Sequence, residues 1–138
     1  MPCIRYRDLT SLSLSIVCVY IPSNSPLTVY DDFLNAIETL LRKVNKTDSV
    51  LLIGDLNMSH TSWKAVPDSN YLTPIGSSET SANIINCLFE SCVSQINSIS
   101  NGFDKMLNLV FVSDSSEFSV IRCMPIADPE DQHYRHLK

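Results

Sequence analysis

The sequence has few charged residues, and the charge that it carries is more acidic than basic. Only 18% of its 138 residues are Asp, Glu, Lys or Arg, and the formal net charge is −5 at pH 7. A protein that coats nucleic acid non-specifically needs an excess of Lys and Arg to neutralise phosphates, so this class is disfavoured. The composition still allows an enzyme that meets nucleic acid through a metal ion in an acidic cleft.

From the sequence we expect no membrane span, no signal peptide and no Cys-x-x-Cys pair. No apolar run approaches the roughly 20 residues that cross a bilayer, and the basic residues of segment 1–7 are not followed by an uninterrupted apolar segment. The five cysteines are odd in number and contain no Cys-x-x-Cys pair, which argues against structural zinc and a disulfide framework. We expect an intracellular protein, in the nucleus or cytoplasm, that is not bound to membranes.

Apolar residues make up 44% of the chain and fall into strand and helix patterns. The length suits one domain over residues 1–138. Residues 11–21 begin as an alternation of Ser and apolar residues and then become wholly apolar, which predicts a strand entering the core. Residues 28–45 repeat apolar side chains at spacings of three and four, as an amphipathic helix does. The continuous apolar run after it, 50–53, predicts a buried strand, and this strand–helix–strand order favours neighbouring parallel strands in an α/β fold.

The second half of the chain alternates irregular and regular segments. Residues 58–77 contain Pro, Asn, Asp and Gly and predict a long loop, of a length that is often functional. Its one tryptophan, Trp63, is expected to anchor this loop. A second helix is predicted at 79–93, a short strand at 94–97, and apolar strands at 106–112 and 118–123.

The chain is organised around the strand that ends in Gly54-Asp55-Leu56-Asn57. On an extended backbone, Asp55 and Asn57 share a face of the strand. A carboxylate and an amide oxygen placed together can hold a hard cation, or orient a phosphate and a water. The alternative is an ordinary polar turn, because Asp and Asn are common turn residues. Tyr20 ends the preceding strand, where it either serves the same site or packs at the rim, and sites in such sheets lie at the carboxyl ends of strands.

Two of these segments resemble a known family. Residues 19–22 (Val-Tyr-Ile-Pro), followed by a helix and by residues 52–57 (Leu-Ile-Gly-Asp-Leu-Asn), resemble the endonuclease/exonuclease/phosphatase superfamily. They are more closely similar to the endonuclease domain that precedes reverse transcriptase in non-LTR retrotransposons. Residues 107–113 resemble the next motif of that domain, and residues 131–134 (Asp-Gln-His-Tyr) stand where its closing Asp-His motif belongs. The resemblance covers essentially residues 11–138.

The resemblance implies a fold, a reaction and roles for individual residues. It implies a DNase I-like α/β fold, a two-sheet sandwich flanked by helices, and metal-dependent cleavage of phosphodiesters, usually with Mg²⁺. Asp55 would position or activate the attacking water, Asn57 would contact the scissile phosphate or the metal, and Tyr20 would approach the phosphate. His133 would stabilise developing charge, and Asp55, Asn57 and His133 would be the metal ligands. DNA would be the partner, with reverse transcriptase fused in the full element.

The sequence departs from the family pattern at three places. Asn108 stands where the family carries an Asp that orients the catalytic histidine, and an amide lacks the charge that stabilises an imidazolium. The family histidine aligns with either His133 or Tyr134. The chain is also expected to be a partial domain, incomplete at its N-terminus, without the family's early Asn and Glu and with an exposed sheet edge. We therefore expect weak or no nicking of DNA; the alternatives are a non-catalytic mobile-element fragment and a small-molecule phosphoesterase.

Overall fold

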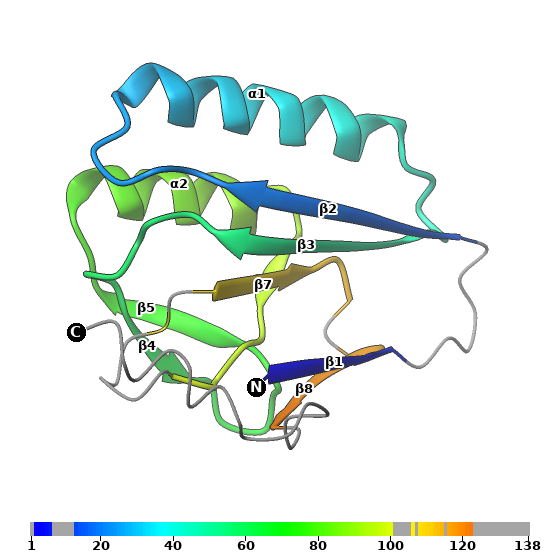
Figure 1. Cartoon of the computed structure of the whole chain (residues 1–138). Coiled ribbons are helices and arrows are strands. Elements are labelled where there is room, and N and C mark those ends of the chain that lie inside the picture. Colours follow the sequence, from blue (N-terminus) through cyan, green and yellow to red (C-terminus); the bar gives the residue numbers. More distant parts are fainter. Residues whose placement is uncertain (1, 7–12, 101–105, 107, 115, 123–138) are drawn as a thin grey trace, which may run out of the picture.

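The computed structural model describes residues 2–6, 13–100, 106, 108–114 and 116–122. These residues form a mixed α/β fold of strands and two helices (Figure 1). In chain order the elements are β1 (Pro2–Tyr6), β2 (Leu14–Tyr20), α1 (Leu27–Lys43), β3 (Ser49–Asp55), β4 (Ser62–Ala65), β5 (Leu72–Gly76), α2 (Glu79–Glu90), β6 (Ser94–Gln95), β7 (Asn108–Val112) and β8 (Phe118–Arg122).

The larger sheet has six strands in the order β2-β3-β7-β6-β5-β4. Its β2 and β3 strands are parallel, as the strand–helix–strand pattern predicts, and all its other neighbours are antiparallel. Among the described residues, β2 is one edge strand of this sheet. The β1 and β8 strands pair with each other in a separate two-stranded sheet.

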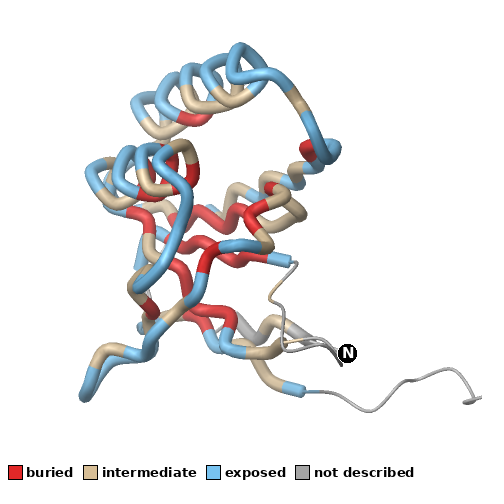
Figure 2. Tube along the Cα trace, turned by 90° about the vertical axis from the view of Figure 1, so that its left-hand side faces the viewer, coloured by how far each residue is buried: buried red, intermediate tan, exposed pale blue. Residues whose placement is uncertain are grey.

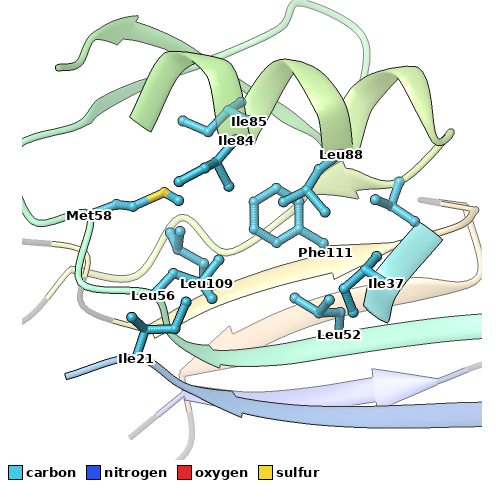
Figure 3. Close-up of a cluster of buried hydrophobic side chains, with 11 residues drawn as sticks. Ile21, Ile37, Leu52, Leu56, Met58, Ile84, Ile85, Leu88, Leu109 and Phe111 are labelled. Carbon is cyan, nitrogen blue, oxygen red and sulfur yellow. The ribbon is translucent and has the colours of Figure 1, made fainter. Parts of the chain in front are cut away.

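Both helices lie on one face of the six-stranded sheet (Figure 1). Helix α2 is capped by Ser78, whose side chain accepts a hydrogen bond from the Ser81 N–H. The core beneath the helices joins Ile37 of α1 and Leu88 of α2 to Phe111 of β7, and each is at most 6% exposed (Figure 3). The amphipathic pattern of each helix therefore packs against the sheet as the sequence predicts.

The central strands are buried on both faces, which explains their continuous apolar sequences. Along β3, Leu52 faces the helices, whereas Leu51 and Ile53 face a second cluster. That cluster includes Phe118 of β8, and Ile4 of β1 packs against it. Buried residues accordingly follow the sheet and the inner sides of the helices (Figure 2).

The structure differs from the sequence predictions in two segments, 58–77 and 2–6. The segment 58–77 is not a loop throughout, because β4 and β5 form an antiparallel hairpin within it. Both strands are short, and β5 contains Pro74, a residue that is rare inside strands and that therefore masks the strand in the sequence. Strand β5 pairs with β6 only at Leu72, so beyond that point the missing N–H of Pro74 costs no ladder bond on that side. A strand before residue 11 was not predicted: β1 pairs along its whole length with β8, whereas the predicted strand at 11–21 corresponds to β2.

The tryptophan of this hairpin anchors it, as expected. Trp63 lies in β4 and packs against the core beneath the helices. Its ring meets that of Phe111 edge-on, with ring centroids 6.4 Å apart and an interplanar angle of 72°. This edge-to-face arrangement is a favourable one for aromatic pairs.

Candidate functional site

Three of the predicted site residues form a row across three adjacent strands. Tyr20 is the register partner of Asp55 in the parallel pair β2–β3. Asp55 is in turn the register partner of Asn108 in the antiparallel pair β3–β7. Register partners point to the same face of a sheet, so the three side chains share one face, at the ends of the strands. Figure 1 shows this end of the sheet, where β2 and β3 end and β7 begins.

The row lies on the face of the sheet that the helices do not cover. The neighbours of Tyr20 in the chain, Val19 and Ile21, belong to the core beneath the helices. Alternation along the strand therefore turns Tyr20 to the other face, where it is 73% exposed. Asp55 is half-buried and Asn108 is exposed, so a ligand can reach all three residues.

Gly54 allows the strands that carry Tyr20 and Asp55 to approach closely. Its φ is +156°, and a Cβ atom there would lie 1.8 Å from the carbonyl oxygen of Val19, so no other residue fits without moving the strands. Because Gly54 precedes Asp55 and Val19 precedes Tyr20, this contact sets the distance between the two site residues. The glycine at the strand end thus serves a close approach of two backbones.

Asn57 does not share the face of Asp55 by strand geometry, and that prediction needs correction. Strand β3 ends at Asp55, and Asn57 adopts a left-handed backbone with φ of 54°. The Asn57 N–H donates to Oδ1 of Asp55 over 2.8 Å, which makes the segment an Asx-type turn. Leu56, between them, is completely buried and fixes the turn to the core. The turn therefore holds one oxygen of the Asp55 carboxylate in place.

A residue that the sequence reasoning missed, Tyr30 of α1, also reaches this turn. Its hydroxyl donates to the Leu56 carbonyl oxygen over 3.3 Å. Burial, and secondarily the negative charge of Asp55, raise the pKa of Tyr30 above its ordinary value. Tyr30 lies on the inward face of α1 with Ile37, seven residues later, and this helical spacing is the signal that places it near the sheet.

A pair of buried amides, also missed, supports the other end of the row. Gln95 and Asn97 are 0% and 2% exposed. The Asn97 Nδ2 donates to the carbonyl oxygen of Asn108 over 2.6 Å, and its Oδ1 accepts from the N–H of Ile99 over 2.9 Å. Gln95 in turn accepts from the Asn97 N–H and donates to the Asn97 carbonyl oxygen. Two amides within a short buried segment are the sequence signal for this network.

A cavity of about 370 Å³ adjoins the row beside Asn108. Its walls include Ile4, Ile53 and Val110, with the amides of Asn97 and Asn108 as its polar side chains. No charged side chain lines it among the described residues. This recess can take an uncharged group but offers no cation for a phosphate.

The donor set of the row suits a hard cation better than zinc. Within the described part of the chain, no group of three or more His, Cys, Asp or Glu side chains could hold a metal. Asp55 supplies one carboxylate, and amide oxygens are carried by Asn57, two residues further along the chain, and by Asn108, the register partner of Asp55. Mg²⁺ commonly takes one or two carboxylates and completes its shell with water and substrate phosphate, so these residues fit it. His133 and Tyr134, the candidates for the family histidine, lie outside the described residues.

One comparison with known proteins identifies a family over most of the chain. The model of the endonuclease-reverse transcriptase family matches residues 14–129, a span that includes Tyr20, Asp55, Asn57 and Asn108. No curated protein and no solved structure matches the chain. Neither α1 nor α2, the helices of the described chain, is long and apolar enough to cross a membrane. The match begins at the first residue of β2 and extends past β8. The chain therefore belongs to the endonuclease-reverse transcriptase family, whose members are nuclease-type domains of retroelements.

Proposed function

We propose that this protein is the Mg²⁺-dependent endonuclease domain of a non-LTR retrotransposon, and that this chain nicks DNA only slowly. The observation that carries the proposal is the row Tyr20–Asp55–Asn108, which crosses the sheet where β2 and β3 end and β7 begins. It combines a carboxylate, a phenol and an amide without a hydrophobic cover. Phosphodiester hydrolysis requires a carboxylate to orient water and donors that face the phosphate oxygens.

Each residue of the row has a distinct role in the proposed reaction. Asp55, steadied through its Oδ1 by the Asn57 N–H, orients a water molecule and accepts its proton as the water oxygen bonds to phosphorus. One phosphorus–oxygen ester bond breaks as this bond forms, and the leaving oxygen takes up a proton. The Tyr20 hydroxyl, which is exposed, donates to a non-bridging phosphate oxygen. Asp55, Asn57 and His133 are the proposed holders of Mg²⁺, which would neutralise charge on the phosphate.

Asn108 is the reason to expect a low rate. The family resemblance places an Asp at this position to orient a histidine and to stabilise its charged form. An amide can accept a hydrogen bond from the imidazole, but it provides no charge for the imidazolium. In the Ser-His-Asp triad the corresponding change lowers kcat about 10⁴-fold. We infer that Asn108 keeps the orienting contact and loses most of the electrostatic benefit.

The proposal extends to the fold and the cellular setting. We propose that the β1–β8 pair, which packs on the face opposite the helices through Ile4 and Phe118, belongs to the second sheet of a DNase I-like sandwich. The domain would be joined to reverse transcriptase in the full element and would act inside the cell, in the nucleus or cytoplasm. Its net charge of −5 favours one alternative, a phosphoesterase that acts on a small molecule and needs no basic surface.

A nicking assay distinguishes these two functions. Purified protein is incubated with supercoiled plasmid and Mg²⁺, and in parallel with bis(p-nitrophenyl) phosphate, each with and without EDTA. The endonuclease proposal predicts slow relaxation of the plasmid that EDTA and Asp55→Ala both abolish. Hydrolysis of the small diester alone, again lost in Asp55→Ala, would favour the phosphoesterase. Absence of both activities from folded protein would reject the proposal and favour a non-catalytic fragment.

A further inference from the structure

We propose that Tyr30 is a positioning residue of this site: its hydroxyl fixes the turn of residues 55–57 to helix α1, and thereby fixes the carboxylate of Asp55. The consequence for catalysis rests on the proposed function, whereas the effect on the turn does not. The hydroxyl donates to the Leu56 carbonyl oxygen over 3.3 Å and connects residues 26 positions apart. It is thus a tertiary contact between the helix layer and the site.

The turn is held through three backbone groups: two of them bond to other parts of the fold, and the third bonds within the turn. The carbonyl oxygen of Asp55 accepts from the N–H of Ile21 over 2.9 Å, which ties it to β2. The Leu56 carbonyl accepts from Tyr30 of α1. The N–H of Asn57 donates to Oδ1 of Asp55. Of these contacts, only the one from Tyr30 joins the turn to the helix layer.

The position of the Leu56 carbonyl decides the position of the next N–H. The atoms from the Leu56 Cα to the Asn57 Cα form one planar peptide unit, so a carbonyl held on one side sets the direction of the N–H on the other. That N–H is the group that steadies Oδ1 of Asp55. If the Tyr30 hydroxyl is removed, the peptide can rotate and the carboxylate loses its fixed partner. A displacement of about 1 Å can lower a catalytic rate about 100-fold.

The hydroxyl, and not the ring, is the informative part of this side chain. Tyr30 packs against the core beneath the helices together with Phe33 and Leu34. A phenylalanine would keep this packing and would lose only the bond to Leu56. Tyr30→Phe is therefore the natural variant. Tyr71→Phe is a matched control, because Tyr71 packs against the second cluster, with Ile96 and Phe118.

The test measures backbone exchange and catalysis in the same proteins. Amide hydrogen exchange of Asn57 is followed by NMR, and nicking is measured with Mg²⁺ to separate kcat from KM. For Tyr30→Phe we expect the Asn57 N–H to exchange about tenfold faster or more and kcat to fall about tenfold with KM unchanged. Tyr71→Phe should change neither quantity. A merely structural role would lower the folded fraction without changing kcat per folded molecule.

The outcomes separate this inference from the proposed function. If the wild-type protein does not nick DNA, the proposed function fails, and Asn57 exchange alone decides whether Tyr30 holds the turn. Unchanged exchange in Tyr30→Phe overturns the inference, and so does an unchanged kcat in an active enzyme. If Tyr30→Phe does not fold, the wild-type NMR spectrum decides. Nuclear Overhauser contacts between the Tyr30 ring and Leu56 are then expected, and their absence overturns the inference.

Discussion

Tyr20 and Asp55 are register partners at the carboxyl ends of two parallel strands, and their side chains share one face of the sheet. The backbone locks this pairing, because the N–H of Ile21, next to Tyr20, donates to the carbonyl oxygen of Asp55 over 2.9 Å. A phenol and a carboxylate are thereby held side by side at the ends of these two strands. This arrangement is the basis of the proposed phosphodiesterase site.

The contact between Gly54 and Val19 predicts a large penalty for any side chain at residue 54. In Gly54→Ala the new Cβ would lie 1.8 Å from the Val19 carbonyl oxygen, on a backbone that L residues rarely adopt. We expect a loss of about 2–4 kcal/mol in the free energy of unfolding, measured by urea denaturation. The control is Gly76→Ala, because a Cβ at residue 76 meets nothing within 4 Å. Equal stability of the two variants would contradict this explanation.

We expect the buried side chain of Asn97 to stabilise the start of β7, because it donates to the carbonyl oxygen of Asn108. Asn97→Ala leaves the Asn108 carbonyl and the Ile99 N–H without their side-chain partner. We expect a loss of about 1–3 kcal/mol in the free energy of unfolding, because both hydrogen bonds are partly buried and the buried Asn97 amide makes both of them. The comparison variant is Asn35→Ala, at an exposed position of α1, where alanine favours the helix. A destabilisation no greater than that of the comparison variant would refute the role of Asn97.

The raised pKa of Tyr30 predicts a dependence of stability on alkaline pH. The pKa of this phenol is raised from 10.0 by burial and by the Asp55 carboxylate, so the folded state holds the proton more tightly than the unfolded chain does. The resulting stabilisation is complete below the unfolded pKa and is lost as pH rises through the folded pKa. Urea denaturation from about pH 8 to about pH 11 should show a steeper loss for wild type than for Tyr30→Phe. Parallel curves would contradict this prediction.

Because the side chain of Asn108 is neutral, we predict that a carboxylate at this position increases the nicking rate. Asn108→Asp should raise the nicking rate by about tenfold or more, because a carboxylate there can stabilise a charged histidine. Asn108 is exposed, so the melting temperature should change little. The matched control is Asn35→Asp, which adds the same charge at an exposed position of α1. An unchanged rate in Asn108→Asp would exclude the electrostatic explanation for a weak enzyme.

Periodicity and continuous apolar runs were enough to predict the part of the fold that positions the site. Strands β2 and β3 and helix α1 follow the predicted segments, since the central strands are covered on both faces and the helix on one. Strands β1, β4 and β5 were missed because they are short and lack the continuous apolar runs of β3 and β7. Such strands are defined by their partners, and β1 finds its partner more than 100 residues away, at Phe118–Arg122.

The site divides in the same way between local pattern and tertiary contact. The rule that sites gather at strand ends led to Tyr20 and Asp55 from the sequence alone. The position of Asn57 was wrong because the sequence does not reveal that its backbone turns left-handed. Tyr30 and Asn97 were missed because their hydrogen bonds join residues 26 and 11 positions apart. Contacts of this kind follow from packing and leave no regular spacing in the sequence.

The most direct test of the central claim is the Mg²⁺-dependent nicking rate of Asp55→Asn compared with wild type. Asparagine retains an oxygen that can accept from the Asn57 N–H, so the turn and the melting temperature should be preserved, while the charge that orients water is lost. We predict that the nicking rate falls at least about 100-fold at equal folded fraction. Nicking by Asp55→Asn at the wild-type rate would show that the row Tyr20–Asp55–Asn108 is not the phosphodiesterase site.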